Sequence, residues 1–241
     1  MVTTHGIDVS KHNGTINWAM AKTSGKVNFA MLRAGYGRLV SQKDAQFEAN
    51  YKGAKAVGVP IGAYWYSYAL SEDEARAEAD ACLAVLKGKQ FEYPIYYDIE
   101  EEKTLTMGKA RVSAIARAFC EKLEKAGYFV GIYMSASPLT NLITEELRNR
   151  YAVWVAHVNV QKPAYSGAYG MWQYSWKGKV SGISGDVDLD ECYCDYPASI
   201  KAKGLNGFTA PAPEPAKPET KEISLTIDSV TYTGTLTRKE N

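Results

Sequence analysis

Short apolar runs alternate with amphipathic helical patterns along most of this chain, from residue 5 to about residue 196. The apolar runs carry hydrophobic side chains at successive positions, which is typical of strands buried on both faces. Strands and helices that alternate in this way predict a parallel sheet covered by helices. The alternation therefore limits the chain to two α/β architectures, a closed barrel or an open doubly wound sheet.

Six strands are expected in the alternating part, and they cover residues 4–10, 27–37, 59–69, 93–100, 128–135 and 151–158. Between them, helices are expected over residues 44–57, 71–88, about 108–126 and about 138–149, with a short helix or turn over 16–25. Ser71 and Glu74 have the spacing of a capping box at the start of their helix. The last two runs, GMWQYSW and DVDLDECY, predict strands joined without a helix.

The number of strands favours the barrel over the open sheet. About eight strands in roughly 195 residues fit a closed βα barrel that is shorter and less regular than the usual ~250 residues. A doubly wound sheet that binds a nucleotide normally has G-x-G-x-x-G after its first strand, and that motif is absent here. The predicted fold class is therefore α/β, an irregular TIM-like βα barrel.

The balance of charge argues against two classes of partner. The chain has 28 basic and 27 acidic residues, a formal net charge of +1, so we expect no nucleic acid partner. No apolar stretch approaches the roughly 20 residues of a membrane span, so we expect no membrane partner. The N-terminus shows no signal peptide. We therefore expect either release from the cytoplasm by another route or secretion after removal of a signal.

The C-terminal residues differ in composition from the rest. Residues 209–220, TAPAPEPAKPET, have the composition of a Pro/Ala-rich linker. We place the domains at residues 1–200, 201–220 and 221–241. The last segment alternates like a β-hairpin, but 21 residues cannot bury a core of their own. We expect this tail to dock on another surface, to self-associate, or to begin a longer module.

The fourth expected strand, YPIYYDIE, ends in carboxylates. Asp98 and Glu100 are two residues apart, so they lie on the same face of an extended strand. Catalytic groups of parallel α/β folds gather at this end of the strands. Repulsion and burial raise the pKa of at least one of two such carboxyls, and a neutral acid beside a carboxylate is what glycoside hydrolysis requires. The alternative, a solvated acidic turn, suits Glu101 and Glu102 better.

Acids also occur on the first and last expected strands. Asp8 lies on the first strand, and Asp188 lies on the last between Asp186 and Asp190 at alternating positions. A closed barrel brings the ends of these strands to one mouth. The sequence therefore predicts a site that contains Asp8, Asp98, Glu100 and Asp188.

Metal and nucleophile chemistry fit the sequence less well. His5 and Asp8 are three residues apart on a strand and point to opposite faces, which argues against a metal site with His12. The nucleophile motif G-x-S-x-G is absent. The cysteines lack zinc spacing and imply no disulfide framework, so we expect structural thiols at Cys82, Cys120, Cys192 and Cys194. We expect neither a metal nor another cofactor.

Eight strand-associated motifs together resemble one known family. They are HGIDVSKHNGTINW, FAMLRAGYG, GAYWYSYA, YPIYYDIEEE, GIYMSASPL, VWVAHV, MWQYS and VDLDECY. In this order they resemble the family 25 glycoside hydrolases, the Chalaropsis-type lysozymes common among phage endolysins and bacterial wall enzymes. The resemblance covers residues 5 to about 196 and leaves the linker and tail outside. It implies a flattened, irregular βα barrel.

The resemblance also implies an activity. The family hydrolyses the β-1,4 bond between N-acetylmuramic acid and N-acetylglucosamine in bacterial peptidoglycan. The match implies that Glu100 is the general acid/base and that Asp98 assists, through the substrate's 2-acetamido group. Asp8 and Asp188 match further family acids that orient these two or contact the sugar. Asp190 departs from the family ending VDLN, because it replaces the Asn and adds a charge nearby.

Residues near other strand ends are expected to contact sugar by stacking or hydrogen bonding: Arg33, Tyr64, Tyr66, Tyr133, Trp154 and Gln173. Two alternative functions stay open. A chitinase-like hydrolase requires D-x-x-D-x-D-x-E, and Tyr93 and Tyr96 fill two of those four positions. A non-catalytic wall-binding module is expected to lose one of the two acids, yet both are present.

Overall fold

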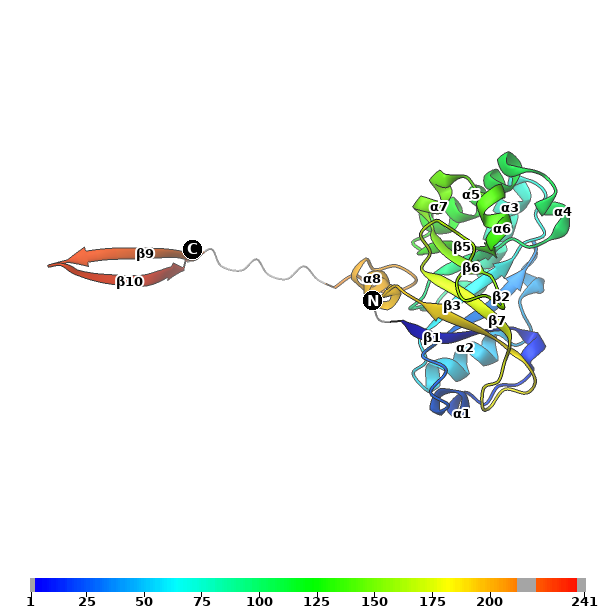
Figure 1. Cartoon of the computed structure of the whole chain (residues 1–241), viewed down its shortest axis with the longest axis horizontal. Coiled ribbons are helices and arrows are strands. Elements are labelled where there is room, and N and C mark those ends of the chain that lie inside the picture. The colour runs from blue at the N-terminus through cyan, green and yellow to red at the C-terminus, as the bar shows by residue number, and fades with distance from the viewer. Residues whose placement is uncertain (1–2, 212–219, 238–241) are drawn as a thin grey trace. The chain divides into compact units, whose positions relative to one another are not determined.

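The computed structural model describes residues 3–211 and 220–237 of the chain. The chain divides into two compact units, Met1–Ala210 and Pro211–Asn241. The described part of the first unit is a closed barrel with surrounding helices, and that of the second is a two-stranded hairpin (Figure 1). None of the described helices combines the length and apolar character needed to cross a membrane.

Eight strands form the barrel in sequence order: β1 (Thr4–Val9), β2 (Phe29–Tyr36), β3 (Ile61–Tyr66), β4 (Ile95–Asp98), β5 (Val130–Ser135), β6 (Ala152–Ala156), β7 (Met171–Gly178) and β8 (Val187–Cys192). Strands β1 to β7 pair in parallel, whereas β8 runs antiparallel to both β7 and β1. No helix separates β7 from β8, as predicted. The reversal places the beginning of β8 at the mouth where the other strands end.

The helices lie outside the barrel: α1 (Trp18–Thr23), α2 (Phe47–Ala56), α3 (Glu72–Leu86), α4 (Glu102–Leu105), α5 (Lys109–Lys125), α6 (Ala136–Leu142), α7 (Glu145–Arg150) and α8 (Tyr196–Ala202). Figure 1 shows α3, α5, α6 and α7 grouped at one side, and α1 and α2 at the opposite side. Two 3₁₀ turns, η1 (Lys11–Asn13) and η2 (Val40–Gln42), follow β1 and β2. Helices α4 and α8 were not predicted, and α4 includes part of the expected acidic turn.

The expected single helix over 138–149 is two helices. Ile143 has extended backbone angles and a fully buried side chain, so it ends α6 and directs the chain into the core. Ser113 on α5 makes the break stable, because its hydroxyl donates to the Leu142 carbonyl at 3.0 Å and accepts from the Thr144 amide at 3.0 Å. Helical periodicity alone did not reveal this break.

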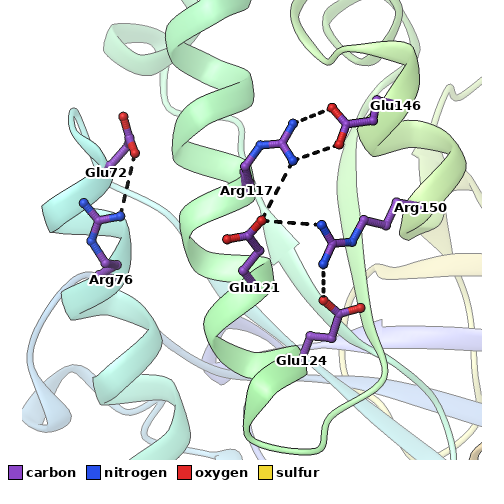
Figure 2. Close-up of polar contacts among 7 residues, drawn as sticks. All are labelled: Glu72, Arg76, Arg117, Glu121, Glu124, Glu146 and Arg150. Atoms are coloured by element: carbon purple, nitrogen blue, oxygen red, sulfur yellow. Dashed lines mark hydrogen bonds and ion pairs between the residues drawn. The ribbon is translucent and has the colours of Figure 1, made fainter.

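Ion pairs connect α5 and α7 on the outer surface (Figure 2). Arg117 binds both carboxylate oxygens of Glu146, at 2.9 and 2.6 Å, and Arg150 contacts Glu121 and Glu124. These side chains are largely exposed, so each pair adds only about 0–1 kcal/mol to stability. The network joins the outer helices α5 and α7, and none of its side chains is one of the acids predicted for the site.

The chain after β8 continues to pack on the barrel. Asn206 is fully buried, donates to the carbonyls of Phe91 and Tyr93, and accepts from the Phe129 amide at 2.7 Å. Part of the expected linker, residues 201–210, therefore belongs to the barrel unit. Most of the remainder, residues 212–219, lies outside the described residues, and the domain boundaries stay predictions.

The second unit is a hairpin of β9 (Thr220–Ile227) and β10 (Val230–Thr237), which confirms the predicted hairpin. Asp228 and Ser229 form its two-residue turn, and both have positive φ, as a tight hairpin turn of the primed type requires. One face carries the apolar side chains Ile223, Leu225, Ile227, Val230, Tyr232 and Leu236, all of them exposed. Residues 238–241 of the predicted tail are outside the described residues.

Candidate active site

A single hollow of about 460 Å³ at the barrel mouth brings together all ten residues that the sequence predicted for the site. Its lining is Asp8, Arg33, Tyr64, Tyr66, Asp98, Glu100, Tyr133, Trp154, Gln173 and Asp188. We call it the acidic hollow. The functional roles of its residues stay predictions, whereas their common location is a property of the fold.

Strand register places the acids. Asp8, near the end of β1, is directly opposite Asp188, near the beginning of β8. Asp98 is the last residue of β4, so Glu100 lies beyond the strand instead of within it, although it lines the same hollow. Ile99 is buried between them, and its amide donates to the Tyr133 carbonyl of β5 at 3.2 Å. This bond continues the sheet pattern and fixes the backbone that carries Glu100.

Gln173 on β7 connects the acids to one another. Its Nε2 donates to Asp8 Oδ2 at 2.7 Å and to Asp188 Oδ2 at 3.3 Å. Its Oε1 accepts from the Tyr133 hydroxyl at 2.8 Å and from Trp176 Nε1 at 3.0 Å. The side chain is 2% exposed and its amide is engaged by the two acids, whereas the sugar contact expected of Gln173 stays a prediction. Sequence reasoning missed Trp176, whose ring is exposed beside it.

Burial raises the pKa of the two acids on and after β4. Asp98 is 3% exposed; burial raises its pKa well above the ordinary range, the charge of Glu100 raises it further, and Arg33 lowers it. Burial also raises the pKa of Glu100, and the charge of Asp188 adds to this effect. When Glu100 holds a proton, its repulsion of Asp98 disappears while Arg33 remains. Burial thus raises the pKa of both carboxyls, and Arg33 opposes that rise at Asp98.

The acids on β1 and β8 form a second group. Burial raises the pKa of Asp8, as do the charges of Asp190 and Asp188, whereas the hydrogen bond from Gln173 lowers it. Burial raises the pKa of Asp188 to about 6. Asp190 is fully buried and accepts from Trp154 Nε1 at 2.8 Å, and burial raises its pKa well above the ordinary range. Crowded, buried like charges cannot all ionise together, so this group retains protons above the usual pH for carboxyls.

Arg33 is held by an acid that the sequence did not indicate. Its Nε is 2.7 Å from Oδ2 of Asp44, which is 2% exposed and lies just before α2. The same oxygen accepts from the Lys11 amide at 3.1 Å. One end of the guanidinium is thus anchored by Asp44, and Nη2 at the other end is buried without a hydrogen-bond partner among the described residues.

The aromatic residues of the hollow differ in exposure. Trp154 and Tyr133 are buried, with ring centroids 4.4 Å apart, so they form its wall. Tyr64 and Tyr66 are half-buried and leave more ring surface accessible. The prediction of stacking on a sugar therefore suits Tyr64 and Tyr66 better than the other two rings, and it stays a prediction for all four.

Other candidate groups stay apart from the hollow. Within residues 3–211 and 220–237, no group of three or more His, Cys, Asp or Glu side chains is arranged to hold a metal ion. His5 is exposed, 3.8 Å from Glu191. The cysteines have free thiols, buried at Cys82, Cys120 and Cys192 and exposed at Cys194.

A βα barrel with a cluster of carboxylates at its mouth has the architecture of a glycoside hydrolase. A family model for glycosyl hydrolases family 25 matches residues 7–183, and the chain belongs to this family. This result agrees with the resemblance found in the sequence motifs.

The relatives of this chain include two bacterial lysozymes. The autolytic lysozyme of Clostridium acetobutylicum is 30% identical over 191 residues, which are 77% of this chain and 55% of the relative. Lysozyme M1 of Streptomyces globisporus is 32% identical over 200 residues, 77% of this chain and 66% of the relative. The solved structure of a bacterial lysozyme from Streptomyces coelicolor has a TM-score of 0.71 and 28% identity, covering 83% of this chain and 96% of the other. The chain thus spans about half the length of the Clostridium relative.

Proposed function

We propose that this protein is a peptidoglycan hydrolase, an N-acetylmuramidase that cleaves the β-1,4 bond between N-acetylmuramic acid and N-acetylglucosamine. Family membership and the lysozyme relatives support this activity. The observation that carries it is the gathering of Asp8, Asp98, Glu100 and Asp188 in one hollow. A chitinase-like hydrolase or a non-catalytic module accounts for these findings less well.

Glu100 is the general acid in this proposal. Its raised pKa keeps a proton available for the glycosidic oxygen, and it is the less buried member of its pair, within reach of a sugar chain. After the bond breaks, the same carboxylate accepts a proton from the attacking water. One residue then serves as acid in the first step and base in the second.

Asp98 assists as an ionised neighbour. Its Oδ1 is buried and has no hydrogen-bond partner among the described residues. When the 2-acetamido group of the substrate attacks its own anomeric carbon, positive charge develops at its N–H. A carboxylate oxygen that accepts a hydrogen bond from this N–H stabilises the charge. Asp8 and Asp188, bridged by Gln173, orient the sugar at the opposite side of the hollow.

The bacterial cell wall is the expected place of action, reached either by release from the cytoplasm, as an endolysin is released, or by secretion. The tail hairpin has an uncovered apolar face, and self-association through it is a further part of the proposal.

Digestion of purified peptidoglycan tests the activity directly. The new ends are reduced with borohydride and identified by mass spectrometry. Reduced muramic acid at the new ends is the expected result, whereas reduced glucosamine would identify a glucosaminidase instead. No new ends on several wall types would reject the hydrolase and favour the binding module.

The rate of cleavage is expected to show a bell-shaped pH profile. Activity falls as pH rises through the raised pKa of Glu100, which then loses its proton, and falls at low pH when Asp98 becomes protonated. Asp188→Asn removes a charge that raises the Glu100 pKa, so the alkaline limb of kcat/KM should move to lower pH. Asp186→Asn is the control, because Asp186 is exposed and paired with Lys179. An alkaline limb that stays in place in Asp188→Asn contradicts this account.

Removal of residues 211–241 is expected to leave hydrolysis of soluble glycan within about twofold of the full chain. The barrel unit ends at Ala210 and contains every residue of the acidic hollow. Steady-state rates on soluble glycan, with the melting temperature as the control for folding, provide the measurement. A large loss of rate in a truncated protein that melts normally would show that the tail contributes to the site.

A further inference from the structure

A second hollow, of about 470 Å³, adjoins the acidic hollow and shares Arg33 and Tyr66 with it. Its lining is Lys11, His12, Arg33, Tyr36, Tyr66 and Tyr68. We call it the cationic hollow. Lys11 and His12 follow β1, Arg33 and Tyr36 lie in the second half of β2, and Tyr66 and Tyr68 lie at and just after the end of β3. The cationic hollow is therefore at the same barrel mouth as the acidic hollow.

The two hollows differ in charge. The acidic hollow has four carboxyl groups in its lining, whereas the lining of the cationic hollow has no acid. Lys11 and His12 are exposed, and none of the ion pairs within the described residues involves either side chain. Arg33 is paired with Asp44 through Nε and its Nη2 is buried, so the accessible nitrogen donors of this hollow belong to Lys11 and His12. The cationic hollow therefore offers nitrogen donors to an anion without a competing carboxylate in its lining.

Three tyrosines form the other part of the cationic hollow. The Tyr68 ring lies 6.0 Å from Tyr36 and 5.1 Å from Tyr66, between centroids, and is 49% exposed. The Tyr68 amide donates to Oε1 of Glu78 at 2.8 Å. Glu78 is fully buried on α3, so it fixes the backbone that carries this ring. Fixed rings with an accessible face provide a platform for a sugar.

We propose that the cationic hollow binds a wall sugar through a carboxylate that this sugar carries, next to the bond cut in the acidic hollow. This inference rests on the proposed function for its substrate class. Each muramic acid carries a lactyl group, whose carboxyl is either free or joined to a peptide with carboxylates of its own. Lys11 and His12 bind the carboxylate, and the tyrosines bind the ring. The enzyme then favours glycan that carries charged arms over neutral glycan.

Binding to three soluble glycans tests the proposal. The first carries stem peptides, the second has been freed of peptide so that its lactyl carboxylates are exposed, and the third is the second with those carboxylates converted to neutral methylamides. Calorimetry on Glu100→Gln, which should bind without cleavage, gives the Kd of each. The same titrations follow with Lys11→Gln and His12→Gln added to that protein. Lys52→Gln is the matched control, because Lys52 is an exposed lysine of α2 that lines neither hollow.

The double replacement is expected to weaken binding of at least one charged glycan roughly five- to tenfold, as for the loss of two accessible nitrogen donors to a carboxylate. The neutral glycan should bind equally with and without the replacement. An effect on the peptide-free glycan identifies the lactyl carboxylate as the ligand, and an effect on the peptide-bearing glycan alone identifies the peptide. Equal Kd values for every glycan, or no binding at all, overturn the inference. The proposed function is tested separately, by digestion of peptidoglycan with the unchanged protein. Normal digestion together with equal Kd values would therefore reject this inference and keep the proposed function.

Discussion

Replacement of Glu100 with glutamine is expected to lower kcat on peptidoglycan by about 10²- to 10⁴-fold, the usual contribution of a general acid and base. The amide has the same shape as the carboxylic acid, but it has no proton of suitable acidity for the leaving oxygen. The fold should be unaffected, because Glu100 lies beyond β4 at a half-buried position and the change removes a charge from a crowded cluster. Initial rates of release of reducing ends measure the loss.

Glu101→Gln is the matched control, since it makes the same change one residue away, outside the acidic hollow. We expect its kcat to stay within about threefold of the unchanged protein and the melting temperatures of both variants to agree. Near-normal turnover by Glu100→Gln would remove Glu100 from the mechanism, and the proton donor would then have to be sought among Asp8 and Asp188.

The positions of the catalytic candidates were predictable because the sequence shows directly where each strand ends and in which order the strands follow one another along the chain. A carboxylate that ends an apolar run, as Asp98 does, needs a special environment, and a barrel brings such ends together. The antiparallel direction of β8 was not apparent, since the sequence of a strand does not give its direction. The consequence is nevertheless the same, because β8 starts where β1 ends and so pairs Asp188 with Asp8.

The supporting residues were not predictable in the same way. Asp44 lies in a loop before α2 and acquires its role only because the fold brings it against Arg33 of β2. Gln173 was expected to contact sugar, and only the structure reveals that its amide bridges two acids. Trp176 and Asp190 likewise depend on contacts across the barrel, with Gln173 and with Trp154. Sequence periodicity reports which face is buried, but not which partner meets a side chain there.

Asp98→Asn is expected to lower kcat by about 10²- to 10³-fold with little change in KM, a loss typical of removing one preorganised electrostatic group. Asp98 is 3% exposed and its Oδ1 has no partner among the described residues, so the carboxylate is placed to stabilise charge that develops in the substrate. The neutral amide keeps the shape and loses that charge. Rates on soluble glycan with saturating substrate give kcat, and the melting temperature controls for folding.

The role of Asp98 has a sharper test in the substrate. If the 2-acetamido group is the internal nucleophile, the unchanged protein should fail to cleave glycan from which the acetyl group of muramic acid has been removed, and chemical re-acetylation should restore cleavage. If Asp98 itself attacks the sugar, de-N-acetylated glycan remains a substrate, and Asp98→Ala should regain turnover with azide and yield a glycosyl azide. We expect the first outcome, because the positive charge of Arg33 favours the ionised form of Asp98, and a buried carboxylate stabilises positive charge that develops on the substrate.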